Sequence, residues 1–350
     1  MTSPETEPTV SVIVPVHRGG SMFKHCLDGV AALQPAADEV LVVLDGADAV
    51  AERQAGELDF TTISLPVRRG PAAARNAGAR AARGRILFFL DADVSPAADA
   101  VAKVRRAFSA DQDLAALFGS YDDEPAAPNF LSQFKNLQHH YVHQHANEQA
   151  ATFWGACGAI RADTFRDFDG FDETYPVPSI EDIELGTRLH AGGRRIRLDK
   201  SLQVKHLKCW RTATLLRADV LHRAVPWTCL ILRQGRMPND LNLRWSGRWS
   251  VVAAYVVLGA LGAAGWWPAL LLVAGLAAAA LLAMNFPLYR FFYRRRGLIF
   301  TLAAVSWHWF YFLYGGAGFI AGLLIHLTAG LRKQPARPDA AQTGPKREAP

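Results

Sequence analysis

The chain has 350 residues, half of them hydrophobic, which allows one sizeable domain and a further segment. Its formal net charge is +6 at pH 7, but the basic residues lie in scattered Arg-rich patches near apolar segments, which argues against a nucleic-acid partner and favours a membrane surface. The cysteines form no C-x-x-C pair, which excludes a zinc site or a disulfide framework and predicts reduced, structural thiols; they are Cys26, Cys157, Cys209 and Cys229.

The first predicted elements alternate between strands and helices. Residues 1–9 include MTSPETEP, which has neither the basic region nor the apolar core of a secretory signal, so we expect a disordered start to a domain that folds in the cytoplasm. Residues 10–16 predict a β-branched strand, and Ser21 is the expected N-cap of a helix over residues 22–33. Residues 39–44 predict the next strand, with Asp45 at its carboxyl end.

Two aspartates follow the most apolar of these strands. Residues 86–90, ILFFL, form a continuous apolar run, typical of a strand that is covered on both faces. Asp91 and Asp93 come directly after it, where ligands lie in open α/β sheets. They are placed to hold a cation or a sugar hydroxyl, although such a pair is more common in a solvated turn. A strand over residues 61–65 and a helix over residues 72–83 precede this run, and the alternation predicts a doubly wound, mostly parallel sheet.

The next part of the chain continues this pattern. A helix over residues 97–110 and a strand over residues 115–119 are followed by a helix over residues 130–145. His139 and His143 lie four residues apart on that helix, a spacing that also suits metal ligands. No acidic or cysteine partner lies nearby in the sequence, so we expect a solvated helix face instead.

A second pair of carboxylates lies near the end of this domain. After the small-residue stretch GACGA, which lets backbone approach a ligand, a helix follows Ser179 and ends at Gly192. Glu181 and Asp182 fall in its first turn, where the helix dipole favours negative charge. Helix capping is the alternative to a functional role for this pair. Residues 194–207 continue the sheet.

The C-terminal part is strongly apolar. Residues 250–285 carry no charged residue and are divided by GWWP at residues 265–268. A single straight helix of this length, at about 1.5 Å per residue, would far exceed a hydrocarbon core of about 30 Å. We therefore expect a hairpin of two spans, over about residues 250–264 and 268–285, with arginines on both flanks that place the first domain in the cytoplasm, at the inner membrane. The alternative is a buried helical hairpin of a soluble domain.

A third apolar stretch covers residues 298–327. It is interrupted by GGAG at residues 315–318, so we expect either one tilted span or two half-spans that turn back. Residues 286–296, FPLYRFFYRRR, have the composition of an amphipathic helix at the membrane surface. Residues 331–350 lack apolar periodicity and are expected to be disordered.

Six motifs, taken in order over residues 10–206, resemble the signature elements of family 2 glycosyltransferases with the GT-A fold; they are VSVIVPV, VVLDGAD, GPAAARNAGARAARGRILFFLDADV, GACGAIRADTF, GFDE and EDIELGTRLHAGG. The resemblance implies a Rossmann-like α/β catalytic domain, over residues 10–235, that precedes a helical membrane domain over residues 236–330. It also implies transfer of a sugar from a nucleotide-sugar donor to an acceptor, with inversion at the anomeric carbon.

The resemblance assigns roles by position. Asp45 would hold the nucleobase, Asp91 the ribose or sugar, and Asp93 a divalent cation on the diphosphate. Asp182 would be the general base, which must reach the anomeric carbon from the side opposite the leaving group. The resemblance also implies further site residues, which are Pro15, Arg75 and Asn76 for the donor and Trp154, Gly155 and Glu181 for the acceptor region.

The leaving diphosphate requires neutralisation of its charge. A carboxylate-held Mg²⁺ or Mn²⁺ would supply this, assisted by Arg75. His206 either joins the metal or diphosphate or is a satisfied structural histidine.

Two departures from the family pattern bear on the substrate. Leu44 stands where the family commonly has another aspartate, so base recognition rests on Asp45 alone or is looser. The chain also lacks the QxxRW element of processive synthases, so we expect it to add one or a few sugars. The hairpin that follows the first domain favours a lipid or lipid-linked acceptor. A membrane-anchored nucleotidyltransferase and an inactive nucleotide-sugar-binding relative are the competing hypotheses.

Overall fold

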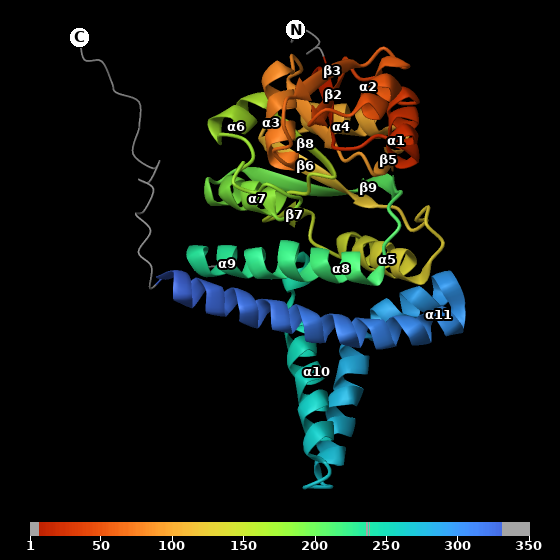
Figure 1. The fold of residues 1–350 in the computed structure, drawn as a ribbon, viewed down its shortest axis with the longest axis vertical. Helices are drawn as coiled ribbons and strands as arrows, with labels where there is room; N and C mark the ends of the chain where they lie inside the picture. Colours follow the sequence, from red (N-terminus) through yellow and green to blue (C-terminus); the bar gives the residue numbers. More distant parts are fainter. Residues whose placement is uncertain (1–6, 236, 238, 331–350) are drawn as a thin grey trace, which may run out of the picture.

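The computed structural model describes residues 7–235, 237 and 239–330. An α/β domain stands above a group of helices, from which a long helical hairpin projects (Figure 1). The strands are β1 (Val10–Val16), β2 (Glu39–Asp45), β3 (Thr61–Leu65), β4 (Ile86–Leu90), β5 (Val94–Pro96), β6 (Leu114–Tyr121), β7 (Gln149–Ala150), β8 (Cys157–Arg161) and β9 (Arg195–His206). The predictions of disorder for residues 1–6 and 331–350 lie outside the described residues.

The helices of the α/β domain are α1 (Ser21–Ala31), α2 (Ala49–Gly56), α3 (Pro71–Ala81), α4 (Ala100–Ala110), α5 (Phe130–Gln144), α6 (Ala162–Asp167) and α7 (Glu181–Ala191). Those below it are α8 (Thr212–Asp219), the π-helix η1 (Val220–Ala224), α9 (Val225–Gln234), the short 3-10 helix η2 (Leu241–Leu243), α10 (Trp245–Ala263) and α11 (Leu270–Gly330).

The predicted α/β fold is confirmed, with one sheet in the order β3-β2-β1-β4-β8-β6-β9-β5 and β7 paired to β9. The strands β1 to β4 are parallel to one another where they pair. In contrast, β8 runs antiparallel between β4 and β6, so the sheet is mixed. Because β2 and β4 are both parallel to β1, Asp45 and Asp91 lie at the same edge, as the strand pattern predicted.

Apolar cores cover both faces of this sheet. Phe88 of β4 packs in a core with residues of α1, α2 and α4. Phe89 points to the other face, into a core with residues of α3, α6 and α7. This two-sided burial explains why residues 86–90 are apolar without alternation.

The start of the first helix was misplaced in the sequence-based prediction, and the second helix was missed. Helix α1 begins at Ser21 itself, and Gly20 is its N-cap without a side-chain bond. Helix α2 was not predicted, because its polar sequence shows little apolar periodicity. It is started by Asp48, whose side chain accepts a hydrogen bond from the amide of Ala51 at 2.8 Å.

The histidines of α5 do not form a solvated face. His143 is 5% exposed and its Nδ1 lies 3.0 Å from the carbonyl oxygen of Gly119. His139 stacks on it with a ring-centroid distance of 3.9 Å. The opposite face of α5 packs Phe134 and Leu137 against α11, so both faces are covered. The expectation failed because a backbone carbonyl lies within hydrogen-bond distance of His143 and the rings of Tyr121 and Trp154 cover His139. Sequence spacing does not reveal these contacts.

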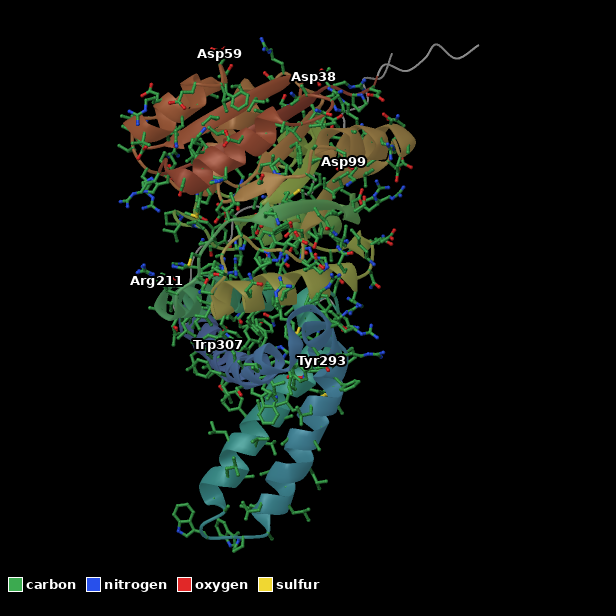
Figure 2. The ribbon with its side chains drawn as sticks, turned by 90° about the vertical axis from the view of Figure 1, so that its right-hand side faces the viewer. Asp38, Asp59, Asp99, Arg211, Tyr293 and Trp307 are labelled. Atoms are coloured by element: carbon green, nitrogen blue, oxygen red, sulfur yellow. The ribbon has the colours of Figure 1, made fainter. Side chains whose placement is uncertain are left out.

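Below the α/β domain, α10 and residues 270–296 of α11 form the expected hairpin (Figure 1). Trp266 and Trp267 lie at its tip and are 75% and 65% exposed. Carbon predominates among the hairpin side chains in Figure 2, whereas the labelled acidic residues Asp38, Asp59 and Asp99 lie at the far end of the molecule. Among the described residues, α10 and residues 270–328 of α11 are long and apolar enough to span a membrane.

The third apolar stretch takes a direction that was not predicted. Gly297 has a φ of +76° and redirects α11, so that residues 298–330 run across the base of the hairpin along α8 and α9 (Figure 1). We call α8, η1, α9 and residues 298–330 the platform. Of the two alternatives for this stretch, the pair of half-spans that turn back is wrong, because the helix is continuous through residues 315–318.

The glycines of residues 315–318 do not form a turn but allow neighbouring helices to pack closely against α11. A Cβ at Gly316 would lie 2.5 Å from the ring of Tyr255, and one at Gly318 would lie 2.7 Å from the Cβ of Ala224. Residues 298–330 therefore pack directly on α10 and η1. Residues 286–296, expected as a surface helix, end the second hairpin helix and bury Phe292 against α5.

Candidate active site

Arg75 of α3 connects the two carboxylate pairs that the sequence singled out. Its Nη2 donates to Asp91 at 2.6 Å and its Nη1 donates to Glu181 at 2.9 Å. The guanidinium is 4% exposed, and although burial opposes its charge, the two carboxylates raise its pKa. A buried charge is tolerated only when it is paired, so these groups hold the end of β4 and the start of α7 together. This pairing was not foreseen for a side chain expected to bind phosphate.

Asp182 lies beside this group. Its Oδ2 accepts a hydrogen bond from the amide of Gly155 at 2.9 Å, and its Oδ1 accepts one from Ile183 at 2.7 Å. A Cβ at Gly155 would lie 3.3 Å from Cζ of Arg75 and 3.4 Å from Cβ of Asp182, so this glycine keeps the two side chains close. Helix α7 has Ile180 as its N-cap, whose side chain makes no capping bond, whereas Asp182 itself accepts from a first-turn amide of the helix.

The environment of Asp182 suits a proton acceptor. Burial and the charge of Glu181 raise the pKa of Asp182 to about 6, although hydrogen bonds from Gly155 and Ile183 oppose the shift. A general base works best when its pKa lies near the working pH. An aspartate with this pKa is mostly ionised at pH 7 and still a better base than an exposed one.

Asp93 and His206 meet at the end of β4. Lys208 lies 3.5 Å from the carboxylate of Asp93, and the amide of Leu207 donates to the carbonyl of Asp93 at 2.9 Å. Burial opposes the charge of Asp93, but Lys208 and His206 lower its pKa. Burial and Asp93 raise the pKa of Asp91 despite Arg75.

His206 is chemically available as a ligand. It is 3% exposed, its ring stacks on Tyr121 at 4.2 Å, and its Nδ1 is buried without a hydrogen-bond partner. Burial lowers its pKa to about 4, so the imidazole is neutral at pH 7. A neutral imidazole beside a carboxylate fits a divalent cation. Within the described residues no group of three or more metal-ligating side chains converges, so a cation would take further ligands from a bound diphosphate.

Two residues that were expected to bind the nucleotide-sugar donor use their side chains to hydrogen-bond backbone groups. The carboxylate of Asp45 is 4% exposed and accepts the amides of Arg69 at 2.6 Å and Gly70 at 3.0 Å. Gly70, at φ +93°, precedes α3, so Asp45 holds the loop that starts this helix. The side chain of Asn76 bonds to both backbone groups of Phe171. Direct donor contact by either residue stays a prediction, as does that of Pro15 in β1.

A cavity of about 870 Å³ separates the α/β domain from the platform and α10. Asp182 and Trp154 form part of its wall on the α/β side. The opposite wall consists mainly of apolar and aromatic residues of α9, α10 and α11. Figure 2 labels Arg211 and Trp307, which lie at the level of the platform.

Sequence reasoning missed a polar group in this wall. Lys135, Asp219, Arg223 and Tyr314 all line the cavity and come from α5, α8, η1 and α11. Only the spacing of Asp219 and Arg223, four residues apart on one helix, is visible in the sequence. Nothing in the sequence brings the other two residues to them.

Comparisons with known proteins agree with this geometry. Residues 11–169 match the family model for glycosyl transferase family 2. The pre-mycofactocin glycosyltransferase of Mycobacterium tuberculosis is 28% identical over 218 residues, which cover 56% of this chain and 42% of that protein, so the match spans less than half of the relative. The mannosyltransferase PcManGT from Pyrobaculum calidifontis, solved in complex with GDP-Man and Mn²⁺, superposes with a TM-score of 0.57 at 19% identity, over 93% of this chain and 88% of that one. The chain therefore shares the fold of that enzyme.

Proposed function

We propose that this chain, which carries a family 2 glycosyl transferase domain, transfers a sugar from a nucleotide-sugar donor to a lipid or lipid-linked acceptor at a membrane. The observation that carries the proposal is the position of Asp182. It contacts the loop at Gly155, beside the Arg75–Asp91 pair at the strand ends, and it also lines the apolar cavity above the platform. A base in this position stands between a donor at the sheet edge and an acceptor in the cavity.

The proposed step is a single displacement. Asp182 takes the proton of the acceptor hydroxyl as that oxygen bonds to the anomeric carbon of the donor. The bond from this carbon to the diphosphate breaks, and its electron pair leaves with the nucleoside diphosphate. Attack from the face opposite the leaving group inverts the anomeric configuration. Gly155 orients the carboxylate through its amide, and Arg75 fixes Asp91 in the donor crevice.

Asp93 and His206 would hold a Mg²⁺ or Mn²⁺ ion. Such an ion neutralises charge that develops on the departing diphosphate. The unpaired Nδ1 of His206 and the accessible carboxylate of Asp93, 26% exposed, support this assignment.

Removal of the metal site should weaken donor binding and turnover together. We expect Asp93→Asn, or treatment with EDTA, to lower donor affinity and the rate of nucleoside diphosphate release by about a hundredfold, because several kcal/mol of charge stabilisation are lost. Asp99→Asn is the control, since Asp99 is exposed and pairs with Lys103. Calorimetry and product release measure both quantities. Unchanged values in chelator and in the variant would exclude the metal role.

The rate of transfer should depend on the protonation of Asp182. Its pKa near 6 predicts a single-turnover rate that is low at pH 5, rises through pH 6 and levels off above pH 7. The same shift, upward from 3.8, means that the contribution of Asp182 to stability is present below pH 4 and is lost as the pH rises through 6. A rate that is flat from pH 5 to 8 would contradict the assignment of the base.

The arrangement of charge supports an integral membrane protein with its catalytic domain in the cytoplasm. Basic residues gather at the base of the hairpin, on the side of the α/β domain, whereas its tip carries two exposed tryptophans. This distribution follows the positive-inside rule and the interfacial preference of tryptophan. The basic residues at the base are Arg244, Arg248, Arg290, Arg294, Arg295 and Arg296.

The proposal is tested by supplying the membrane-embedded protein with a panel of nucleotide sugars, Mg²⁺ or Mn²⁺, and lipid or water-soluble acceptors. We expect release of a nucleoside diphosphate and a glycosylated lipid. Release of pyrophosphate would instead indicate a nucleotidyltransferase. Binding of a donor without any release would indicate an inactive relative, and equal activity on a soluble acceptor would exclude the lipid.

A further inference from the structure

An ion cluster that the proposed step does not use lies in the wall of the same cavity. Asp219 is 6% exposed and accepts hydrogen bonds from Nζ of Lys135 at 2.8 and 3.0 Å. Its carboxylate also accepts from Nη1 of Arg223 at 3.2 Å and from the hydroxyl of Tyr314 at 2.9 Å. We call these four residues the Asp219 cluster.

The Asp219 cluster carries more positive than negative charge, because two cations share one carboxylate. The side chain of Arg223 is 46% exposed, against 15% for Lys135, and Arg223 lines the cavity. A cation in an apolar cavity is costly unless an anion accompanies it.

The local backbone holds Arg223 in a fixed relation to the candidate base. Arg223 lies in η1, a π-helical turn between α8 and α9, and such turns occur frequently at functional sites. The hydroxyl of Ser179 donates to the carbonyl of His222 at 2.7 Å, which ties η1 to the loop before α7. Although burial opposes its charge, Asp219 raises the pKa of Arg223, with smaller effects from Tyr121 and Asp182.

The apolar part of the cavity continues to the outer surface. Residues of α10 and the platform line the cavity and are also exposed, among them Val252 at 49% and Ile320 at 50%. Gly315 lies in the same wall, and a Cβ at this position would meet no atom within 4 Å. An apolar chain can therefore leave the cavity between α10 and the platform.

We propose that Arg223, together with Lys135, binds an anionic group of the phosphate class on the acceptor, while the apolar chain of that acceptor leaves between α10 and the platform. The inference rests on the proposed function, since it names the chemical class of acceptor at the same site: an amphiphile that carries an anion. The excess charge of the Asp219 cluster complements the anion, and the aromatic and aliphatic wall complements the chain. A neutral lipid would leave the net positive charge of the Asp219 cluster uncompensated.

The test measures binding by the full chain in lipid nanodiscs. The probes are dodecyl phosphate, dodecanol and inorganic phosphate. Their binding is monitored by the change in the tryptophan fluorescence of the protein. We expect dodecyl phosphate to bind at least about tenfold more tightly than either other probe. Arg223→Gln should weaken dodecyl phosphate binding by about 10- to 100-fold and leave dodecanol binding unchanged, because it removes one charged hydrogen bond.

The control is Arg217→Gln, which removes an exposed arginine of α8 outside the cavity wall. It should bind dodecyl phosphate like the parent. Arg223→Lys keeps the charge and should restore a large part of the affinity. The comparison of the three probes on the parent protein decides the question even if Arg223→Gln does not fold.

Several outcomes would overturn the inference. These are equal affinity for dodecyl phosphate and dodecanol, binding of inorganic phosphate as tight as that of the amphiphile, and unchanged dodecyl phosphate binding in a folded Arg223→Gln protein. A different result would show that the proposed function is wrong. In that case no donor would give nucleoside diphosphate release, while dodecyl phosphate would still bind in a way that depends on Arg223. Sugar transfer to a neutral amphiphile, unaffected by Arg223→Gln, would overturn this inference alone.

Discussion

Asp182→Asn should lower the rate of sugar transfer by about a hundredfold or more, the usual contribution of a positioned base, while donor affinity stays nearly unchanged. The substitution keeps the shape of the side chain and leaves Asp91 and Asp93 in place. Both carboxylate oxygens of Asp182 accept amide protons, and an asparagine can satisfy only one of them. We therefore expect a loss of about 1 kcal/mol of stability, partly offset because no charge is buried.

The measurements are donor calorimetry, thermal melting and single-turnover transfer. Glu184→Gln is the matched control, since Glu184 lies on the same helix and pairs with Arg188 at 2.7 Å. A variant at position 182 that transfers sugar at nearly the parent rate would remove Asp182 from the mechanism. Loss of donor binding together with a lower melting temperature would assign it a structural role instead.

Arg75→Gln should reduce the free energy of unfolding by about 3–5 kcal/mol, the usual effect of removing one partner from a buried ion pair. It would leave Asp91 and Glu181 without their cation at 2.6 and 2.9 Å. The donor crevice would lose its geometry at the same time, so activity should fall with stability. Lysine should not restore the parent stability, because one ammonium does not replace the two-armed contact of the guanidinium.

Arg80→Gln provides the control for this experiment. Arg80 lies on the same helix, its side chain is 65% exposed, and its nearest carboxylate oxygen, on Glu173, is 3.7 Å away. An exposed pair of this kind contributes less than about 1 kcal/mol. Chemical denaturation in detergent compares the two variants. Equal midpoints for both would show that the Arg75 pairs do not stabilise the fold.

The strand ends of the candidate site were predictable because their placement follows from the alternation of strands and helices along the sequence. Parallel strands that alternate with helices bring their carboxyl ends to one edge, so Asp45 and Asp91 could be placed together. The connection from Arg75 to Glu181 could not be predicted, since it joins residues 106 positions apart. It depends on the antiparallel β8, whose short sequence gives no sign of its direction.

The cavity was unpredictable for a different reason. Its lower wall exists only because Gly297 turns the chain, and apolar composition indicates burial or a membrane but not the direction of a helix. GGAG was interpreted as a break because glycine is a poor helix former in water. Here the same glycines admit Tyr255 and Ala224 to the helix surface, a tertiary role that local propensity does not reveal.

On the proposals above, the cavity would also fix how far the reacting hydroxyl lies from the anchored anion. Asp182 and the Asp219 cluster belong to one packed body, because Ser179 and Tyr314 bind η1 and α8 from both sides. The span between an anchored anion and the base is therefore nearly constant. An acceptor that has gained a sugar carries its next hydroxyl one ring farther from its own anchor, beyond the reach of Asp182. The fixed distance would then limit the number of sugars added, and the product would be released after the first transfer.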